Sequence, residues 1–179
     1  MSEVYLKKAK KTPETGTSET RKIVERMLSE IEIGKETIAK KYASDLDGFN
    51  GDIIVSQESI ENASKMVPEK LKDDIKFAHE RIKKFAEAQK QSINEFETEL
   101  SPGLWAGQKL IPIQTAGCYV PGGRYAHVAS AIMSITTARV AGVENIIACS
   151  APKGEDGPNP AILYTCLLYT SDAADDTCC

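Results

Sequence analysis

The sequence of 179 residues predicts an α/β fold, in which a group of amino-terminal helices precedes the beginning of a parallel sheet. Within residues 1–100, apolar side chains recur at intervals of three and four, which is the spacing of amphipathic helices. Residues 117–149 then read as a strand, a glycine-containing turn, a helix and a second strand. This order is typical of a βαβ unit, whose two strands run parallel. From Cys166 the character of the chain changes abruptly, so we expect the sheet to be incomplete.

Several short elements are predicted before residue 68. Gly34 is expected to end a first helix and Gly48 a second one, because glycine favours the left-handed conformation that closes many helices. Residues 53–55, Ile-Ile-Val, are a candidate for a brief strand. Ser56 can then cap a third helix through its hydroxyl group.

The longest predicted element begins at Pro68 and is a helix of about thirty residues, or about 40 Å. One face of this helix is an apolar stripe, and Lys and Glu side chains occupy the opposite faces. The stripe indicates that the helix packs against a domain or a partner subunit. His79 lies beside the stripe, where we expect a surface or boundary residue rather than a ligand. The stripe consists of Leu71, Ile75, Ala78, Ile82, Phe85 and Phe96.

The second half of the chain predicts short strands around one helix. Residues 110–113 and 117–120 are expected to form strands, and Pro121-Gly122-Gly123 a turn. A helix of small and apolar residues is expected at 126–141, followed by a buried strand at 145–149.

The turn from Tyr119 to His127 is the part of the chain that could carry chemistry. In an open parallel sheet, ligands bind beyond the carboxyl ends of the strands, near the amino ends of the following helices. Gly122 and Gly123 would let an anionic group approach the backbone there, although an ordinary strand-to-helix turn has the same pattern. Arg124 and His127 are either a cationic pair that binds a substrate anion, or a solvated arginine and a capping or buried histidine.

Composition and charge exclude several classes of protein. The formal net charge of -4 argues against general binding to nucleic acid, which needs clustered Lys and Arg. No apolar run approaches about 18 residues, so no membrane-spanning segment is expected. The amino terminus does not resemble a secretory signal, which favours a cytoplasmic location. The chain has 2 histidines and no motif of a catalytic nucleophile, so neither a complete zinc site nor a catalytic residue is expected in it.

The cysteines fall into two groups. Cys118 and Cys149 lie in apolar runs and are expected to be buried, reduced thiols. Residues 160–165 read as the opening of a helix, but the sequence CLLYTSDAADDTCC that follows resembles a sequencing-library adapter translated in frame. We therefore expect residues 166–179 to be a non-native tail. The alternative, a Cys-rich metal-binding tail, lacks the paired spacing that zinc requires.

The run GCYVPGGRYAHVASAIMSITTARVAGVENIIACSAPK resembles the nucleotide-domain segment of the histidinol dehydrogenase family. The stretch RYAHVASA after PGG resembles the sulfopropanediol 3-dehydrogenase branch more than histidinol dehydrogenase proper. The segments FAHERIKKFAEAQKQS and PGLWAGQKLIPIQTAG also fit that branch. The resemblance covers essentially the whole chain to Thr165.

This resemblance implies a zinc- and NAD-dependent oxidoreductase that takes an alcohol through an aldehyde to a carboxylate in two hydride transfers. It also implies a homodimer with Rossmann-like domains. In the sulfonate branch, the substrate is 2,3-dihydroxypropane-1-sulfonate and the product is sulfolactate. The tyrosine of the family's YVPGG motif contacts NAD and corresponds to Tyr119, and Gly122 and Gly123 belong to the same loop. The family's zinc ligands and catalytic Glu-His pair lie downstream of the segment matched here, so we expect this chain alone to be inactive and poorly folded.

Three parts of the chain are expected on this basis. Residues 1–100 form a helical region, residues 101–165 part of a Rossmann-like NAD-binding domain, and residues 166–179 the non-native tail. The basic residues Arg124 and His127 favour an anionic sulfonate as the substrate. Two alternatives remain open. One is oxidation of L-histidinol to L-histidine, and the other is a non-catalytic helical module that mediates dimerisation.

Overall fold

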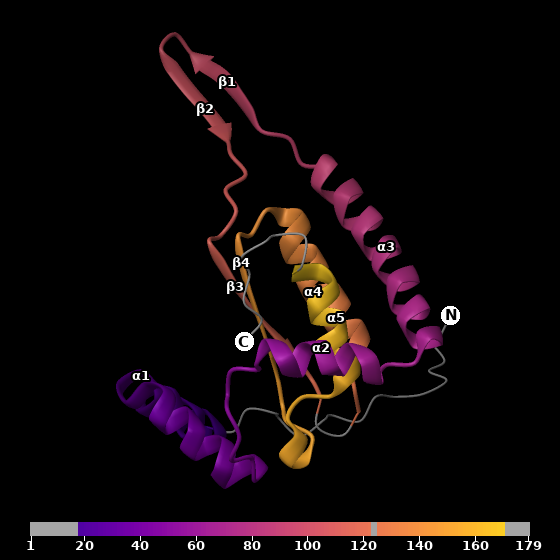
Figure 1. Cartoon of the computed structure of the whole chain (residues 1–179). Coiled ribbons are helices and arrows are strands. Elements are labelled where there is room, and N and C mark those ends of the chain that lie inside the picture. The colour runs from indigo at the N-terminus through magenta and orange to yellow at the C-terminus, as the bar shows by residue number, and fades with distance from the viewer. Residues whose placement is uncertain (1–17, 123–124, 171–179) are drawn as a thin grey trace, which may run out of the picture.

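The computed structural model describes residues 18–122 and 125–170 and confirms the predicted α/β class. Figure 1 shows a body made of α2 to α5 and the strands β3 and β4, with α1 beside its lower end. A two-stranded arm, β1 and β2, projects from the opposite end of the body. Among the described residues, none of the helices combines the length and the apolar character needed to cross a membrane.

Helix α1 spans Ser18–Asp47, but the chain folds back within it at Lys35, whose φ is 50° and ψ is -136°. The Tyr42 hydroxyl donates a hydrogen bond of 2.6 Å to the Glu30 carboxylate. In a straight helix, residues twelve positions apart are separated by about 18 Å, so this bond requires the reversal. The structure thus confirms the helix end predicted at Gly34, next to the turn.

Helix α2 spans Gln57–Met66, and Ser56 caps it as predicted. The Ser56 hydroxyl accepts a hydrogen bond from the Ser59 backbone N–H at 3.2 Å. The strand predicted at residues 53–55 is wrong, because this segment has no regular structure. A strand needs a neighbouring strand for its backbone hydrogen bonds, and β3 and β4 pair only with each other among the described residues.

Helix α3 spans Glu69–Gln91, which confirms a long helix but shortens the predicted one. The Ser92 hydroxyl donates to the Gln89 carbonyl oxygen at 2.7 Å, which closes the last turn. Phe96 was expected on the apolar stripe of this helix, and that prediction is wrong because the residue begins strand β1, Phe96–Ser101. Strand β1 pairs antiparallel with β2, Leu104–Gln108, and Gly103 supplies the positive φ of 80° in the turn between them.

The strand predicted at residues 110–113 is also wrong, because the structure places this segment outside regular structure. Pro112 has no backbone N–H to donate to a ladder, and it is disfavoured within sheets except at edges. Ile111 is 82% exposed, so burial does not hold the segment against a neighbouring strand.

The predicted βαβ unit is confirmed. Strand β3, Thr115–Val120, leads into helix α4, Val128–Ala141, and then into strand β4, Asn145–Ser150. The two strands are parallel, with Thr115 paired to Asn145 and Val120 to Ser150. After the short 3₁₀ helix η1, Gly154–Asp156, the chain enters helix α5, Pro160–Thr170.

Helix α4 lies at the centre of the apolar core. It packs against α3, α5 and both strands of the parallel sheet. Burial of a large aliphatic side chain contributes about 1.5–3 kcal/mol. The most deeply buried large side chains come from several elements: Ile75 of α3, Val120 of β3, Ile135 of α4, and Ile162 and Thr165 of α5.

Helix α5 continues past Thr165, where the non-native tail is expected to begin, and ends at Thr170. Cys166 is only 3% exposed and belongs to the core cluster. The first residues after the proposed junction therefore pack as part of the helix. The non-native origin of residues 166–179 and the boundary at residue 100 stay predictions.

Cysteine burial differs from the expectation at one position. Cys118 and Cys149 are both free thiols, as predicted, but only Cys118 is buried. Cys149 is exposed because its side chain lies on the face of β4 that α4 does not cover.

His79 of α3 is half-buried. Burial lowers the pKa of His79 below its usual value. The positive charge of Lys83 lowers this pKa further, and the negative charge of Glu80 raises it.

The connection from β3 to α4 packs tightly at Gly122, which is buried. A Cβ atom at this position would overlap the Ser150 hydroxyl, and it would lie 3.2 Å from the Ala151 carbonyl oxygen and from the Ile162 Cδ1 atom. The absence of a side chain at Gly122 thus lets the loop close against the end of β4.

We expect Gly122→Ala to lower the free energy of unfolding by about 1–3 kcal/mol, because an added methyl group would overpack this contact. Gly117→Ala is the matched control, since a Cβ atom there meets nothing within 4 Å. Urea denaturation followed by circular dichroism measures both changes. Equal stability of the two variants would contradict the role given to Gly122.

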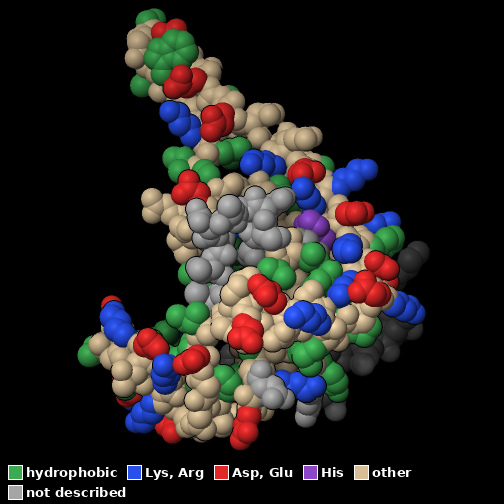
Figure 2. Space-filling model, viewed as in Figure 1, with side chains coloured by type: hydrophobic (Ala, Val, Ile, Leu, Met, Phe, Trp, Pro, Cys, Tyr) green, Lys and Arg blue, Asp and Glu red, His purple; other side chains and the backbone are tan. Residues whose placement is uncertain are grey.

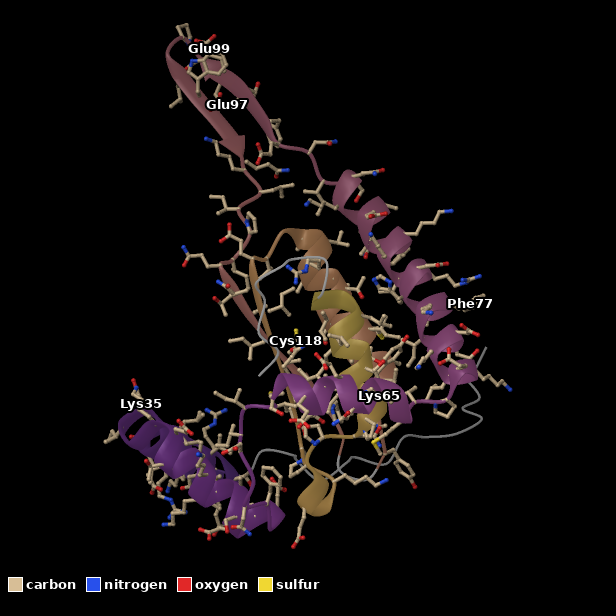
Figure 3. The ribbon with its side chains drawn as sticks, viewed as in Figure 1. Lys35, Lys65, Phe77, Glu97, Glu99 and Cys118 are labelled. Atoms are coloured by element: carbon tan, nitrogen blue, oxygen red, sulfur yellow. The ribbon has the colours of Figure 1, made fainter. Side chains whose placement is uncertain are left out.

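We expect Lys35→Gly to raise the free energy of unfolding by about 1 kcal/mol, because glycine adopts the turn conformation in α1 without strain. Lys35 is exposed at the tip of α1, so the substitution removes no packing (Figure 3). Lys41→Gly, in the helical part of α1, should lower the same quantity by about 1 kcal/mol. A loss of stability in Lys35→Gly under urea denaturation would refute this interpretation.

Candidate functional site

A cleft of about 450 Å³ lies at the carboxyl ends of β3 and β4. Strand β3 contributes Tyr119, and the end of β4 contributes Cys149 and Ser150. Ala151 and Pro152, which follow β4, complete this wall. This is the position at which open parallel sheets bind ligands, as the sequence predicted.

Tyr119 reaches the cleft because side chains alternate along β3. Its neighbours Cys118 and Val120 are buried, and Val120 is fully covered in the core. Tyr119 therefore points away from the core, and it is 64% exposed. The structure thus places this predicted cofactor-binding residue on a cleft wall, where its ring can contact a planar ligand.

The opposite wall comes from the second half of α1 and the residues after it. Ala39, Tyr42, Ala43 and Leu46 line the cleft, spaced so that they share one helical face. The Tyr42 hydroxyl is held by the Glu30 carboxylate, and this hydrogen bond raises the pKa of Tyr42. Sequence reasoning did not identify this wall of the cleft, because its position depends on the turn at Lys35.

Carboxylates make the cleft rim acidic on the α1 side. Asp47 and Asp52 are among the lining residues. Lys40 partly offsets this charge, with its Nζ atom 3.9 Å from the Asp52 carboxylate and 2.8 Å from that of Glu36. A rim of this kind suits hydroxyl donors better than phosphate groups, because carboxylates accept hydrogen bonds and repel anions.

The other residues predicted for the site are only partly placed. Gly122 packs against Ser150 and so shapes the end of β4, while Gly123 and Arg124 lie outside the described residues. His127 precedes α4 as its N-cap residue and is exposed, but its side chain makes no capping hydrogen bond. Its backbone N–H donates to the Pro121 carbonyl oxygen at 3.1 Å. His127 does not line the cleft beside Tyr119.

A metal site needs several donor side chains that converge on one point. Across residues 18–122 and 125–170, no group of three or more His, Cys, Asp or Glu side chains could hold one. The residues described here therefore do not fit the zinc ion that the family resemblance implies. For a dinucleotide, the fit is better, since an exposed aromatic ring, a serine at the end of β4 and an acidic rim meet in one cleft.

Known proteins resemble this chain over most of its length. The family model described as Histidinol dehydrogenase matches residues 10–173. A histidinol dehydrogenase homolog of Pelagibacter ubique is 53% identical over 173 residues, which cover 96% of this chain and 40% of that protein. The sulfopropanediol 3-dehydrogenase of Ruegeria pomeroyi is 49% identical over 168 residues, covering 94% of this chain and 39% of that protein.

A solved structure gives the same result. The crystal structure of histidinol dehydrogenase from Elizabethkingia anophelis superposes with a TM-score of 0.80 at 29% sequence identity. The match covers 93% of this chain and 38% of the other. The chain therefore spans about two fifths of the length of the relatives it matches, and its described architecture follows theirs over that part. The chain belongs to the histidinol dehydrogenase family.

Proposed function

We propose that this chain is part of an NAD-dependent alcohol dehydrogenase, and that its Tyr119 cleft binds one portion of NAD. The observation that carries the proposal is the position of Tyr119, which lies exposed in a cleft at the carboxyl ends of two parallel strands. Family membership supports the same reaction class.

Each wall of the cleft has a defined task in this proposal. The Tyr119 ring stacks against a planar ring of the dinucleotide, and Asp47 or Asp52 accepts hydrogen bonds from ribose hydroxyls. The apolar residues of α1 exclude water from the bound rings. When bound, NAD supplies the acceptor for the hydride that leaves the alcohol.

The described residues leave the proton transfer of the reaction unassigned. They contain no set of metal ligands, so we derive no step that involves zinc. Oxidation of an alcohol also needs a group that accepts the hydroxyl proton. In this proposal, the described part of the chain binds and orients the cofactor, and the remainder of a complete enzyme supplies the base.

For the substrate, we favour 2,3-dihydroxypropane-1-sulfonate, which would be oxidised to sulfolactate. The high identity to a sulfopropanediol 3-dehydrogenase supports this choice. The alternative is L-histidinol, and it is supported by relatives such as the histidinol dehydrogenase of Methanococcus maripaludis, which is 36% identical over 150 residues. Arg124 and His127 are proposed to contact the sulfonate, because a permanent anion needs cationic partners.

In a complete enzyme that contains this segment, we expect NAD to bind in a calorimetric titration, and Tyr119→Ala to weaken that binding at least about tenfold through loss of ring stacking. Tyr125→Ala is the matched control, since Tyr125 is 71% exposed and does not line the cleft. Equal affinities of the two variants would overturn the assignment of Tyr119. Self-association without any NAD binding would favour the helical dimerisation module instead.

In a complete enzyme that contains this segment, we expect Arg124→Ala to raise KM for 2,3-dihydroxypropane-1-sulfonate about tenfold or more, because a charge-assisted hydrogen bond is lost. The KM for L-histidinol, which carries no sulfonate, should change little. Steady-state kinetics with both alcohols measures the difference. An unchanged KM for the sulfonate would refute contact between Arg124 and that group.

A further inference from the structure

Asn50 and Gly51 lie in the connection between α1 and α2, at the outside of the molecule (Figure 1). Both residues are exposed, and neither belongs to a helix or a strand. The sequence contains five asparagines, and Asn50 is the only one that is followed by glycine. The others precede alanine, glutamate, isoleucine and proline. Asn50 therefore differs in its local chemistry from every other asparagine of the chain.

An asparagine that precedes glycine can lose its side-chain amide without the help of an enzyme. In this reaction, the backbone nitrogen of the following residue attacks the Cγ atom of the asparagine. A side chain on the following residue hinders the approach. Glycine has no Cβ atom and its backbone adopts many conformations, so its nitrogen reaches the Cγ atom with little strain. Asn50 and Gly51 thus place the two reacting groups next to each other.

The backbone nitrogen of Gly51 is accessible for this attack. Within residues 18–122 and 125–170, its N–H donates no hydrogen bond to another group of the protein. Nitrogens inside helices and strands are held in the backbone hydrogen bonds of those elements, which keeps them from the neighbouring side chain. The residues that follow Asn62 and Asn145 are of this second kind, because they lie within α2 and β4.

Ser44 of α1 holds the Asn50 side chain. Its hydroxyl donates to the Asn50 Oδ1 atom at 2.8 Å, and the Asn50 Nδ2 atom donates to the Gly48 carbonyl oxygen at 3.4 Å. Attack on the Cγ atom places negative charge on Oδ1. The Ser44 hydroxyl already faces the atom on which this charge develops, so it stabilises the transition state. The fold therefore adds a hydrogen-bond donor to the reactive pair.

We propose that Asn50 is a site of spontaneous deamidation, and that this modification alters the Tyr119 cleft. The Gly51 nitrogen gives up its proton and bonds to the Asn50 Cγ atom, while the bond from Cγ to Nδ2 breaks and ammonia leaves. Water then opens the resulting succinimide at either of its two carbonyl groups. The products are aspartate and isoaspartate at position 50. The reaction consumes water, releases ammonia, and needs no oxidant or reductant.

Residues on both sides of Asn50 line the Tyr119 cleft, among them Phe49 and Asp52. A carboxylate at position 50 has no N–H to donate to the Gly48 carbonyl oxygen, so two acceptors face each other there and repel. Isoaspartate also adds one carbon atom to the main chain, which displaces the neighbouring residues. Deamidation therefore changes the shape of the cleft wall that follows α1.

Deamidation also makes the rim of the cleft more acidic. Acidic and basic side chains are mixed over the α1 end of the molecule, at the lower left of Figure 2. The Lys40 Nζ atom already lies 2.8 Å from the Glu36 carboxylate and 3.9 Å from that of Asp52. A new carboxylate at position 50 therefore adds negative charge that repels phosphate groups. This step rests on the proposed function, in which the cleft binds the anionic dinucleotide NAD.

The first test follows the modification itself in a complete enzyme that contains this segment. The folded enzyme is incubated at mildly alkaline pH, which favours loss of the Gly51 proton, and its peptides are mapped by mass spectrometry. We expect Asn50 to be converted at least about tenfold faster than Asn62, Asn94 and Asn145 in the same sample. Equal conversion at all four positions, or none at Asn50, would overturn the proposal.

Ser44→Ala tests the contribution of the fold. It should slow the conversion of Asn50 at least about threefold in the folded enzyme, because Oδ1 loses its hydrogen-bond donor. In concentrated urea, where the two residues no longer meet, the native and Ser44→Ala enzymes should react at the same rate. A folded Ser44→Ala enzyme that reacts as fast as the native one, or faster, would contradict the role given to Ser44.

Asn50→Asp tests the effect on the cleft without waiting for the reaction. In the complete enzyme, it should raise the Kd for NAD about threefold or more, measured by calorimetry. Asn62→Asp makes the same charge change on an exposed position of α2 and should leave the Kd unchanged. Equal NAD affinities of the two variants would overturn the link between Asn50 and the cleft. A native enzyme that deamidates at Asn50 but binds no NAD would instead contradict the proposed function.

Discussion

The burial of α4 is the constraint on which the rest of the structure depends. Its sequence is mostly apolar, so the helix buries most of its surface, and only the face with Ala129, Met133, Thr137 and Ala141 is exposed. The parallel sheet covers one side of α4, and α3 and α5 pack against two others. Ala131 and Ile135 are both fully buried as a result. Because α4 directly connects β3 to β4, this packing also fixes where the two strands end.

The candidate site follows from that arrangement. Val120 must point toward α4, and strand geometry then turns Tyr119 to the opposite face. Helix α4 does not cover this face, so the ring remains available to a ligand or to another part of the protein. The folded-back α1 supplies the second wall of the cleft. The core and the cleft are thus two sides of a single strand pair.

Sequence reasoning succeeded where the determining interactions are local. The βαβ unit and the cap at Ser56 follow from hydrophobic spacing and from one hydroxyl group. It failed at residues 53–55 and 110–113, because a strand exists only when a distant segment pairs with it. Phe96 continues the helical spacing of apolar residues, so the spacing predicted it to lie in α3. The spacing does not reveal that the helix already ends at Ser92. The α1 wall of the cleft required the unusual backbone angles of Lys35, which spacing does not encode.

The proposed cofactor cleft lies outside the apolar core, and this separation bears on what the segment does. The cleft depends on the strand ends and on α1, while the core depends on how α3, α4 and α5 pack against the strands. Fold alone does not assign a function, so each proposal rests on its own residues. The described residues form a cleft suited to binding but contain no metal-ligand cluster. The proposed role of these residues is therefore to position a cofactor, and no step of that proposal passes through a metal ion.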